Sequence, residues 1–166
     1  MMKRFCDPIR SRVPRERRGC GERGSELLEF ALCSIILFTF LFGIIEYCLG
    51  IYSAHFVAIA AQQGTRYAAV RGSGCKAYTS ACPASTTDIK NYVQNLAYPG
   101  ITPTSVAVTT TYAAYPSGTT CTPSATCNNP GNLVTITVGY NYSLIIPFVP
   151  NKTLTFASTA AAIIAE

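Results

Sequence analysis

The residue in this sequence that most clearly needs a compensating partner is Glu29, a carboxylate at the start of an apolar run. No charged residue occurs from Phe30 to Ile45, and this run is rich in Leu, Ile and Phe, which partition well into hydrocarbon. A carboxylate at the edge of a membrane is costly unless a partner compensates its charge. Glu29 therefore calls for a partner group, whereas Glu46, just after the run, can reach the far interface.

Four cysteines, Cys75, Cys82, Cys121 and Cys127, lie in the loop-rich part of the chain after the apolar run. An even set in this position predicts two disulfides in an oxidising compartment. Three pairings are possible, and the short separations favour Cys75 with Cys82 and Cys121 with Cys127. A zinc site is the alternative, but no pair has the two-residue spacing of a zinc knuckle, and the single histidine, His55, lies far upstream. We therefore expect no metal and no other cofactor.

Catalytic groups are sparse beyond the apolar run. The acids there are Asp88 and Glu166, with Glu46 at the boundary, so no carboxylate pair is available for acid–base catalysis. The loop-rich part has no histidine for a Ser-His-Asp relay, and the chain has no glycine-rich phosphate loop. We expect a protein that is not an enzyme.

The charge of the chain is concentrated in its first 24 residues. They hold eight of the 13 Lys and Arg residues and three acids, whereas the remainder holds five residues of each sign. Positive residues before an apolar segment stay on the cytoplasmic side of the membrane, so the rest of the chain should face outward. The neutral remainder offers no basic surface for nucleic acid, and we expect no such partner.

The apolar run is part of a longer helix, which we expect from Ser25 to Ala69 because no helix-breaking residues cluster before Gly72. Sixteen residues reach only about 24 Å, against a hydrocarbon core of about 30 Å, so the span widens to about Leu27–Gly50 and the rest of the helix projects outward. We expect one stripe of the projecting part to pack against the chain's own outer domain, with a subunit interface as the alternative. The stripe consists of small apolar residues, Val57, Ala61, Gly64 and Ala68.

The sequence thus divides into a basic leader (1–24), a transmembrane and projecting helix (25–71) and an outer domain (72–166). The predicted fold class is α+β, with the long helix joined to a small antiparallel sheet. The helix and strands expected in the outer domain are Thr87–Tyr98, capped by Thr86 or Thr87, then Val106–Tyr112, Leu133–Ile146 and Leu154–Thr159, with a turn over Pro147–Asn151. Alternation along Leu133–Ile146 places one set of side chains on the same face: Val134, Ile136, Val138, Tyr140 and Tyr142. The tail from Ala160 to Glu166 either continues the last strand or forms a frayed helical turn.

The junction between leader and apolar run reads Arg23-Gly24-Ser25-Glu26-Leu27-Leu28-Glu29-Phe30. It resembles the class III signal of type IV pilins and pseudopilins, in which a basic leader ends at Gly and the mature chain has Glu at its fifth position. Counted from Ser25, Glu29 is the fifth residue and Phe30 the sixth.

More narrowly, residues 24–70 resemble the TadE-like family of minor pseudopilins, which serve tight-adherence (Flp-type) pili. The stretches that carry the resemblance are Glu29-Phe30-Ala31, Phe42-Gly43-Ile44-Ile45-Glu46 and Ala60-Ala61-Gln62-Gln63-Gly64-Thr65-Arg66-Tyr67-Ala68, and near the end Leu154-Thr155-Phe156-Ala157-Ser158 is similar to the family's closing strand.

The resemblance implies that a prepilin peptidase cuts between Gly24 and Ser25, where the missing side chain of Gly24 lets extended backbone enter a protease cleft. It also implies that Glu29 pairs with the new terminal amine of a neighbouring subunit, although Ser25 is close enough for an intrachain pair. The implied role is assembly or priming of an adhesive pilus. The implied partners are that peptidase, other pseudopilins, the major pilin and the inner-membrane assembly platform. The implied location is the bacterial inner membrane, with a single span, a cytoplasmic leader and a periplasmic or extracellular outer domain, and the pilus as a further location.

Two other interpretations treat the start of the chain differently. An uncleaved, signal-anchored binding module would keep the leader and bind an extracytoplasmic ligand through its sheet. A conventional signal peptide would be cut near Ser53-Ala54 or Tyr67-Ala68-Ala69, but the apolar segment is longer than a usual signal core and continues as helix.

Overall fold

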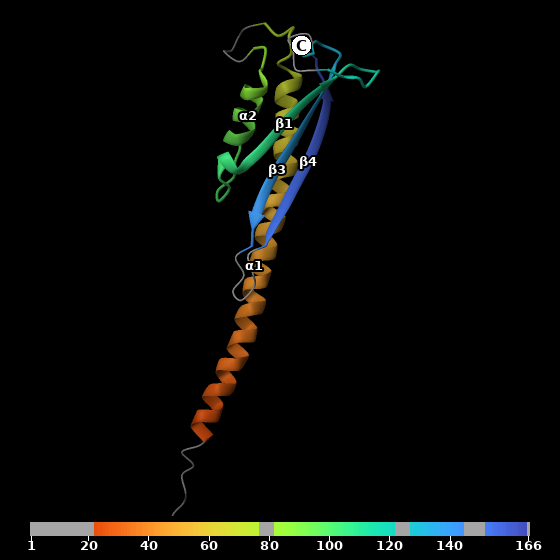
Figure 1. Ribbon diagram of the computed structural model, residues 1–166. Helices are drawn as coiled ribbons and strands as arrows, with labels where there is room; N and C mark the ends of the chain where they lie inside the picture. Colours follow the sequence, from red (N-terminus) through yellow and green to blue (C-terminus); the bar gives the residue numbers. More distant parts are fainter. Residues whose placement is uncertain (1–21, 77–81, 122–126, 145–151, 166) are drawn as a thin grey trace, which may run out of the picture. The chain divides into compact units, whose positions relative to one another are not determined.

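The computed structural model describes residues 22–76, 82–121, 127–144 and 152–165 (Figure 1). It has the expected α+β architecture, a long apolar helix followed by an antiparallel sheet. The chain divides into two compact units, Met1–Thr39 and Phe40–Glu166. Its elements are α1 (Glu22–Ala69), α2 (Thr86–Asn95), the 3-10 turn η1 (Pro103–Ser105), β1 (Val106–Ala113), β2 (Thr120–Cys121), β3 (Leu133–Ser143) and β4 (Thr153–Ile163).

The described part of the first unit is α1 as far as Thr39, and its apolar side chains are exposed. Phe30 is 72% exposed, and the Leu, Ile and Phe side chains that follow it are exposed as well. Within the described residues, α1 is the helix that is long and apolar enough to cross a membrane. Thr39 donates its hydroxyl to the carbonyl of Ile35 at 2.8 Å, so this polar group is satisfied inside the helix. Such a helix fits a single-pass membrane protein.

In the second unit, the four strands form one antiparallel sheet in the order β2-β1-β3-β4. The alternation expected for β3 is present, because Val134, Ile136 and Val138 are fully buried on one face. The neighbouring strands follow the same pattern, because paired residues share a face of the sheet. Val138 is paired with Val108 of β1 and with Ser158 of β4. One face of the sheet therefore contributes to the core and the other face is open to solvent.

The last strand continues into the tail, which was one of the two alternatives expected for residues 160–166. β4 reaches Ile163 because residues 160–163 keep pairing with β3, from Ala160 opposite Ile136 to Ile163 opposite Leu133. Continuation of the strand is therefore confirmed as far as Ile163, and a helical turn over these residues is wrong. β3 itself ends at Ser143, and its expected extension to Ile146, the turn over Pro147–Asn151 and Glu166 lie outside the described residues.

The short helix α2 is confirmed as an element, but both of its ends differ from expectation. Its N-cap is Ser85 rather than Thr86 or Thr87, because the Ser85 hydroxyl accepts from the backbone N–H of Asp88. It ends at Asn95 rather than Tyr98, since Leu96 and Ala97 donate to carbonyls only three residues back. The proline that follows Tyr98 also disfavours helical backbone at that residue.

The small-residue stripe of α1 packs against the chain's own outer domain, as expected. All four of its members, Val57, Ala61, Gly64 and Ala68, are buried. Gly64 makes the closest approach: a Cβ atom at this position would lie 2.7 Å from Cγ2 of Val93 in α2. The stripe has small residues because α2 and β3 lie directly against the helix backbone there.

This close approach predicts a specific loss of stability in Gly64→Ala. Ala is favoured over Gly inside a helix by about 1 kcal/mol, and overpacking a core costs about 1–3 kcal/mol. Gly43→Ala is the matched control, because nothing lies within 4 Å of its added Cβ. In detergent-solubilised full chain followed by circular dichroism, Gly64→Ala should unfold at a lower temperature than Gly43→Ala. Equal melting temperatures would show that Val93 can move aside at no cost.

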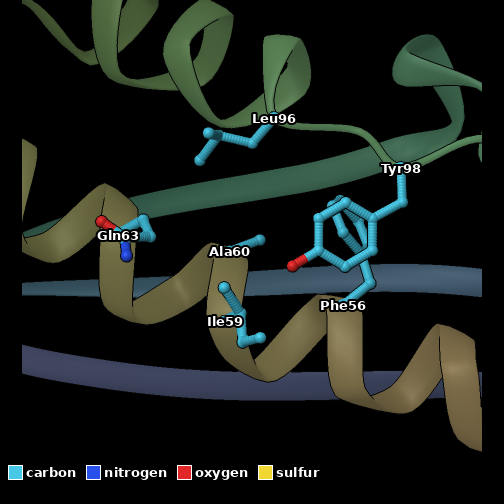
Figure 2. A pocket seen from close by; sticks show the side chains of 6 residues that line it. All are labelled: Phe56, Ile59, Ala60, Gln63, Leu96 and Tyr98. Atoms are coloured by element: carbon cyan, nitrogen blue, oxygen red, sulfur yellow. The ribbon is translucent and has the colours of Figure 1, made fainter.

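Aromatic side chains hold α2 and the segment after it against α1. Tyr67 of α1 stacks on Tyr92 of α2 with ring centroids 4.1 Å apart, and the guanidinium of Arg71 lies 4.0 Å from the Tyr67 ring. Further along, the rings of Tyr98 and Phe56 form a T-shaped pair with centroids 5.2 Å apart (Figure 2). These pairs fix α2 along the buried side of α1.

Candidate processing and assembly site

The bond between Gly24 and Ser25 lies in the first turn of α1. The helix begins at Glu22, three residues before the expected start at Ser25, so both residues of the bond have helical backbone. The reason is that Gly24 alone interrupts helix-compatible sequence there, and one glycine costs a helix only about 1 kcal/mol. The remainder of the leader, residues 1–21, lies outside the described part.

This position leaves the bond easy to expose. The first four N–H groups of a helix have no acceptor within it, so unwinding the first turn sacrifices few hydrogen bonds. Gly24 and Ser25 are both exposed, and nothing lies within 4 Å of a Cβ placed on Gly24. Packing within the described chain therefore does not require glycine at this position.

Glu29 and Phe30 follow one turn later and are also exposed. Among the described residues, the Glu29 carboxylate has no hydrogen-bond or ion-pair partner, and Ser25 does not serve as one. Glu26, three residues before it, is likewise an exposed carboxylate. The helix thus presents Glu29 on its surface at the head of the apolar run, where a second molecule can reach it.

Glu46, at the other end of the apolar run, has a protein partner that the sequence did not reveal. The hydroxyl of Tyr142 in β3 donates a hydrogen bond to Oε2 of Glu46 at 2.6 Å. Burial, and then this hydrogen bond, raise the pKa of Tyr142 to about 12, so the phenol stays protonated and remains a donor at neutral pH. The alternation of β3 had placed Tyr142 on the inner face, but its partner is 96 residues away.

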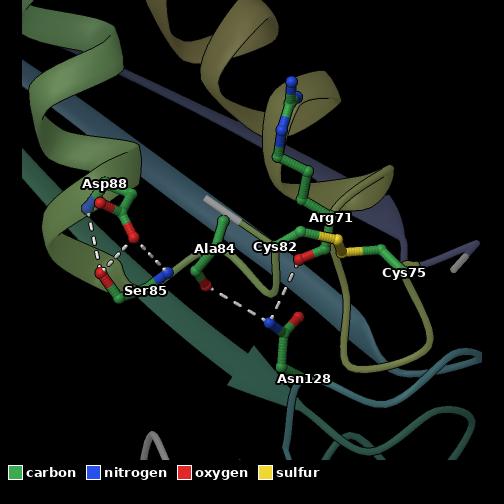
Figure 3. Close-up of a disulfide and its surroundings, with 7 residues drawn as sticks. All are labelled: Arg71, Cys75, Cys82, Ala84, Ser85, Asp88 and Asn128. Atoms are coloured by element: carbon green, nitrogen blue, oxygen red, sulfur yellow. Dashed lines mark hydrogen bonds between the residues drawn. A yellow bond between two sulfur atoms is a disulfide. The ribbon is translucent and has the colours of Figure 1, made fainter. Parts of the chain in front are cut away.

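The outer cysteines are joined as two short loops. Cys75 pairs with Cys82 and Cys121 with Cys127, with Cα atoms 6.0 Å and 6.1 Å apart. The first loop follows the end of α1 and leads into α2 (Figure 3). Beside it, Nδ2 of the buried Asn128 donates to the carbonyl oxygens of Arg71 (3.5 Å) and Ala84 (3.4 Å), which ties both ends of the connection together.

The start of α2 is fixed by a capping box. Asp88 accepts hydrogen bonds from the hydroxyl (2.7 Å) and the backbone N–H (3.0 Å) of Ser85, as Figure 3 shows. These bonds, the hydroxyl first, hold the pKa of the Asp88 carboxyl below its ordinary value. The Ser-x-x-Asp spacing could have predicted this cap from the sequence. Asp88, which follows the disulfide loop in the sequence, thus serves helix α2 as a structural group.

A small hollow of about 190 Å³ lies between α1 and the α2 segment (Figure 2). Its lining contains no carboxylate, imidazole or amine, and consists of Phe56, Ile59, Ala60, Gln63, Leu96 and Tyr98. Within the described ranges, no three His, Cys, Asp or Glu side chains lie close enough together to hold a metal ion.

The stretch from the Gly24–Ser25 bond to the buried stripe is also where the chain is similar to a known family. Residues 24–66 match the model of TadE-like proteins. The resemblance expected from the sequence is therefore confirmed over this TadE-like segment. No curated protein and no solved structure matches the chain.

A TadE-like segment implies a protein associated with the tight-adherence (Tad) pilus, a class that is structural rather than enzymatic. The segment begins at Gly24, includes Glu29 and Phe30, and ends at Arg66 near the end of α1. It contains the site residues at the head of the helix and leaves out all four outer cysteines.

Proposed function

We propose that this chain is a minor pilin-like subunit, a pseudopilin, needed for assembly or priming of a tight-adherence (Flp-type) adhesive pilus. The observation that carries the proposal is the TadE-like match over residues 24–66. The proposal is also supported by a long apolar helix whose exposed first turns carry Gly24, Ser25 and Glu29.

In this proposal a prepilin peptidase removes the leader between Gly24 and Ser25. The cut leaves the whole apolar helix attached to the outer domain, so the product remains in the inner membrane. The N-terminus of the product lies on the cytoplasmic side, because the basic leader oriented the helix before the cut, and the disulfide loops lie in the oxidising compartment outside. The exposed bond in the first turn of α1 suits an enzyme that acts at the membrane surface.

Cleavage also creates a free terminal amine, which can serve as the partner that the Glu29 carboxylate lacks. The new amine at Ser25 of one subunit pairs with the Glu29 carboxylate of a neighbouring pilin-like subunit, and Phe30 packs at the same contact. A carboxylate and an ammonium that meet at the edge of hydrocarbon neutralise each other, which makes entry into a helix bundle less costly. The partners are therefore the peptidase, other pseudopilins, the major pilin and the inner-membrane assembly platform.

The decisive experiment is N-terminal sequencing of the protein extracted from its native membrane, with and without the host's prepilin peptidase. We expect a start at Ser25 that depends on the peptidase. A start at Met1 or Met2 in the presence of the enzyme would replace this proposal with an uncleaved, anchored binding module. A start near Ala54 or Ala69 would instead indicate a secreted soluble domain.

A further inference from the structure

The contact between Tyr142 and Glu46 sets the level of the β3–β4 hairpin along α1. A hydrocarbon core of about 30 Å needs about 20 helical residues, so a span that starts at Phe30 ends near Leu49. Glu46 then lies at or just inside the outer boundary of the membrane. Tyr142 must lie at the same level, because its hydroxyl is 2.6 Å from the Glu46 carboxylate.

The end of the hairpin lies further along α1, toward the apolar run. Phe156 lies opposite Tyr140 and its ring approaches Gly50, whereas Leu154 lies opposite Tyr142, one step nearer the hairpin end. Leu144 then closes the hairpin, with its N–H 2.9 Å from the carbonyl of Lys152.

These side chains border a hollow of about 400 Å³ whose described lining is apolar apart from Glu46 and the hydroxyl of Tyr47. Leu144 and Leu154 share this hollow with Gly43 and Tyr47 of α1, which are residues at the outer end of the span. Leu154 is 42% exposed although it is apolar. The hairpin end and the helix thus present one continuous apolar surface at the depth of Gly43.

Lys152, whose carbonyl accepts the hydrogen bond from Leu144 at the described end of the hairpin, is exposed. A lysine beside an apolar surface can extend its amine to lipid phosphates.

We propose that the described end of the β3–β4 hairpin, where Leu144 and Leu154 lie, is a second membrane contact among the lipids of the outer boundary beside α1. Lipid acyl chains fill the hollow bordered by Leu144, Leu154 and Gly43. Lipid is the occupant because Tyr47, which lines the hollow, is exposed on the part of α1 that the membrane surrounds, as are the neighbouring Ile44 and Ile45. The proposal rests on membrane insertion of α1 and not on the pilus role.

Tryptophan fluorescence can test this insertion, because the chain contains no tryptophan. Leu154→Trp places a single indole at the hairpin end. Tyr115→Trp is the control at the opposite end of the sheet, where Tyr115 is 61% exposed just after β1. Phe38→Trp reports on the span itself. The full chain of each variant is reconstituted in phosphatidylcholine vesicles with or without bromine on the acyl chains near the headgroup.

We expect brominated lipid to quench most of the emission of Leu154→Trp and to leave Tyr115→Trp unchanged. Quenching of Phe38→Trp by lipid brominated deeper in the chain shows that the helix is inserted.

If Phe38→Trp is quenched and Leu154→Trp is not, the hairpin does not touch lipid and the proposal is wrong. Blue-shifted Leu154→Trp emission without bromine quenching would also overturn it, in favour of a second protein copy on this surface. If Phe38→Trp is not quenched either, α1 is not inserted and the proposal falls with it. The vesicles hold no pilus machinery, so none of these results depends on the role in assembly.

Discussion

Gly24→Leu should leave the leader attached to the chain, with processing slowed about 100-fold or more, the size of effect that misplacing a reacting bond by about 1 Å can have. Nothing in the described chain lies within 4 Å of a Cβ added at Gly24, and Gly24 is exposed, so the fold and the apolar helix should be unaffected. Any loss of processing then reports on fit to the peptidase. The measurement is the ratio of long to short chain on a gel, with N-terminal sequencing of both bands.

Gly43→Leu is the matched control for this experiment. Gly43 also lies in α1 with nothing within 4 Å of an added Cβ, and it is 19 residues from the bond. It should be processed at the normal rate. Normal processing of Gly24→Leu would mean that the leader is removed elsewhere or by another enzyme, and the proposed cut would have to be abandoned.

Glu29→Val should be processed and inserted normally and yet fail in pilus assembly. The substitution keeps an apolar side chain at the head of the span and removes the charge that a terminal amine would need. A hydrogen bond to a charged group contributes about 1.5–3 kcal/mol, so each contact should weaken by about 10- to 150-fold. Surface pili counted by electron microscopy should fall to background when Glu29→Val replaces the normal subunit.

Glu26→Val controls for the loss of one carboxylate from the same turn. Both glutamates are exposed in α1, but only Glu29 stands at the fifth position after the proposed cut. Glu26→Val should assemble normally. If both variants assembled normally, pairing with Glu29 would play no part in assembly. If both failed, total charge at the head of the helix would matter rather than one specific pair.

Local patterns in the sequence were enough to predict the long helix of this protein, the buried faces of its elements and its resemblance to a family. A basic leader, an uncharged run and the absence of an early break were enough to predict the long helix, because membrane partition and helix formation depend on neighbouring residues. The 3.6-residue spacing of Val57, Ala61 and Gly64 identified the buried face of that helix. The two-residue alternation of β3 identified its inner side in the same way. The residue order around Gly24 was enough to indicate the TadE-like resemblance.

Tertiary structure decided the features that join distant segments. No local pattern predicts that Tyr142 donates to Glu46, since the two residues are 96 positions apart and meet only when β3 lies along α1. The length of β4 was also decided there, because its last residues are held as strand by pairing with β3 rather than by their own preference. The level that we propose for the hairpin end at the membrane rests on that same contact. Sequence periodicity fixes which face of an element is buried, whereas the position of one element along another depends on long-range packing.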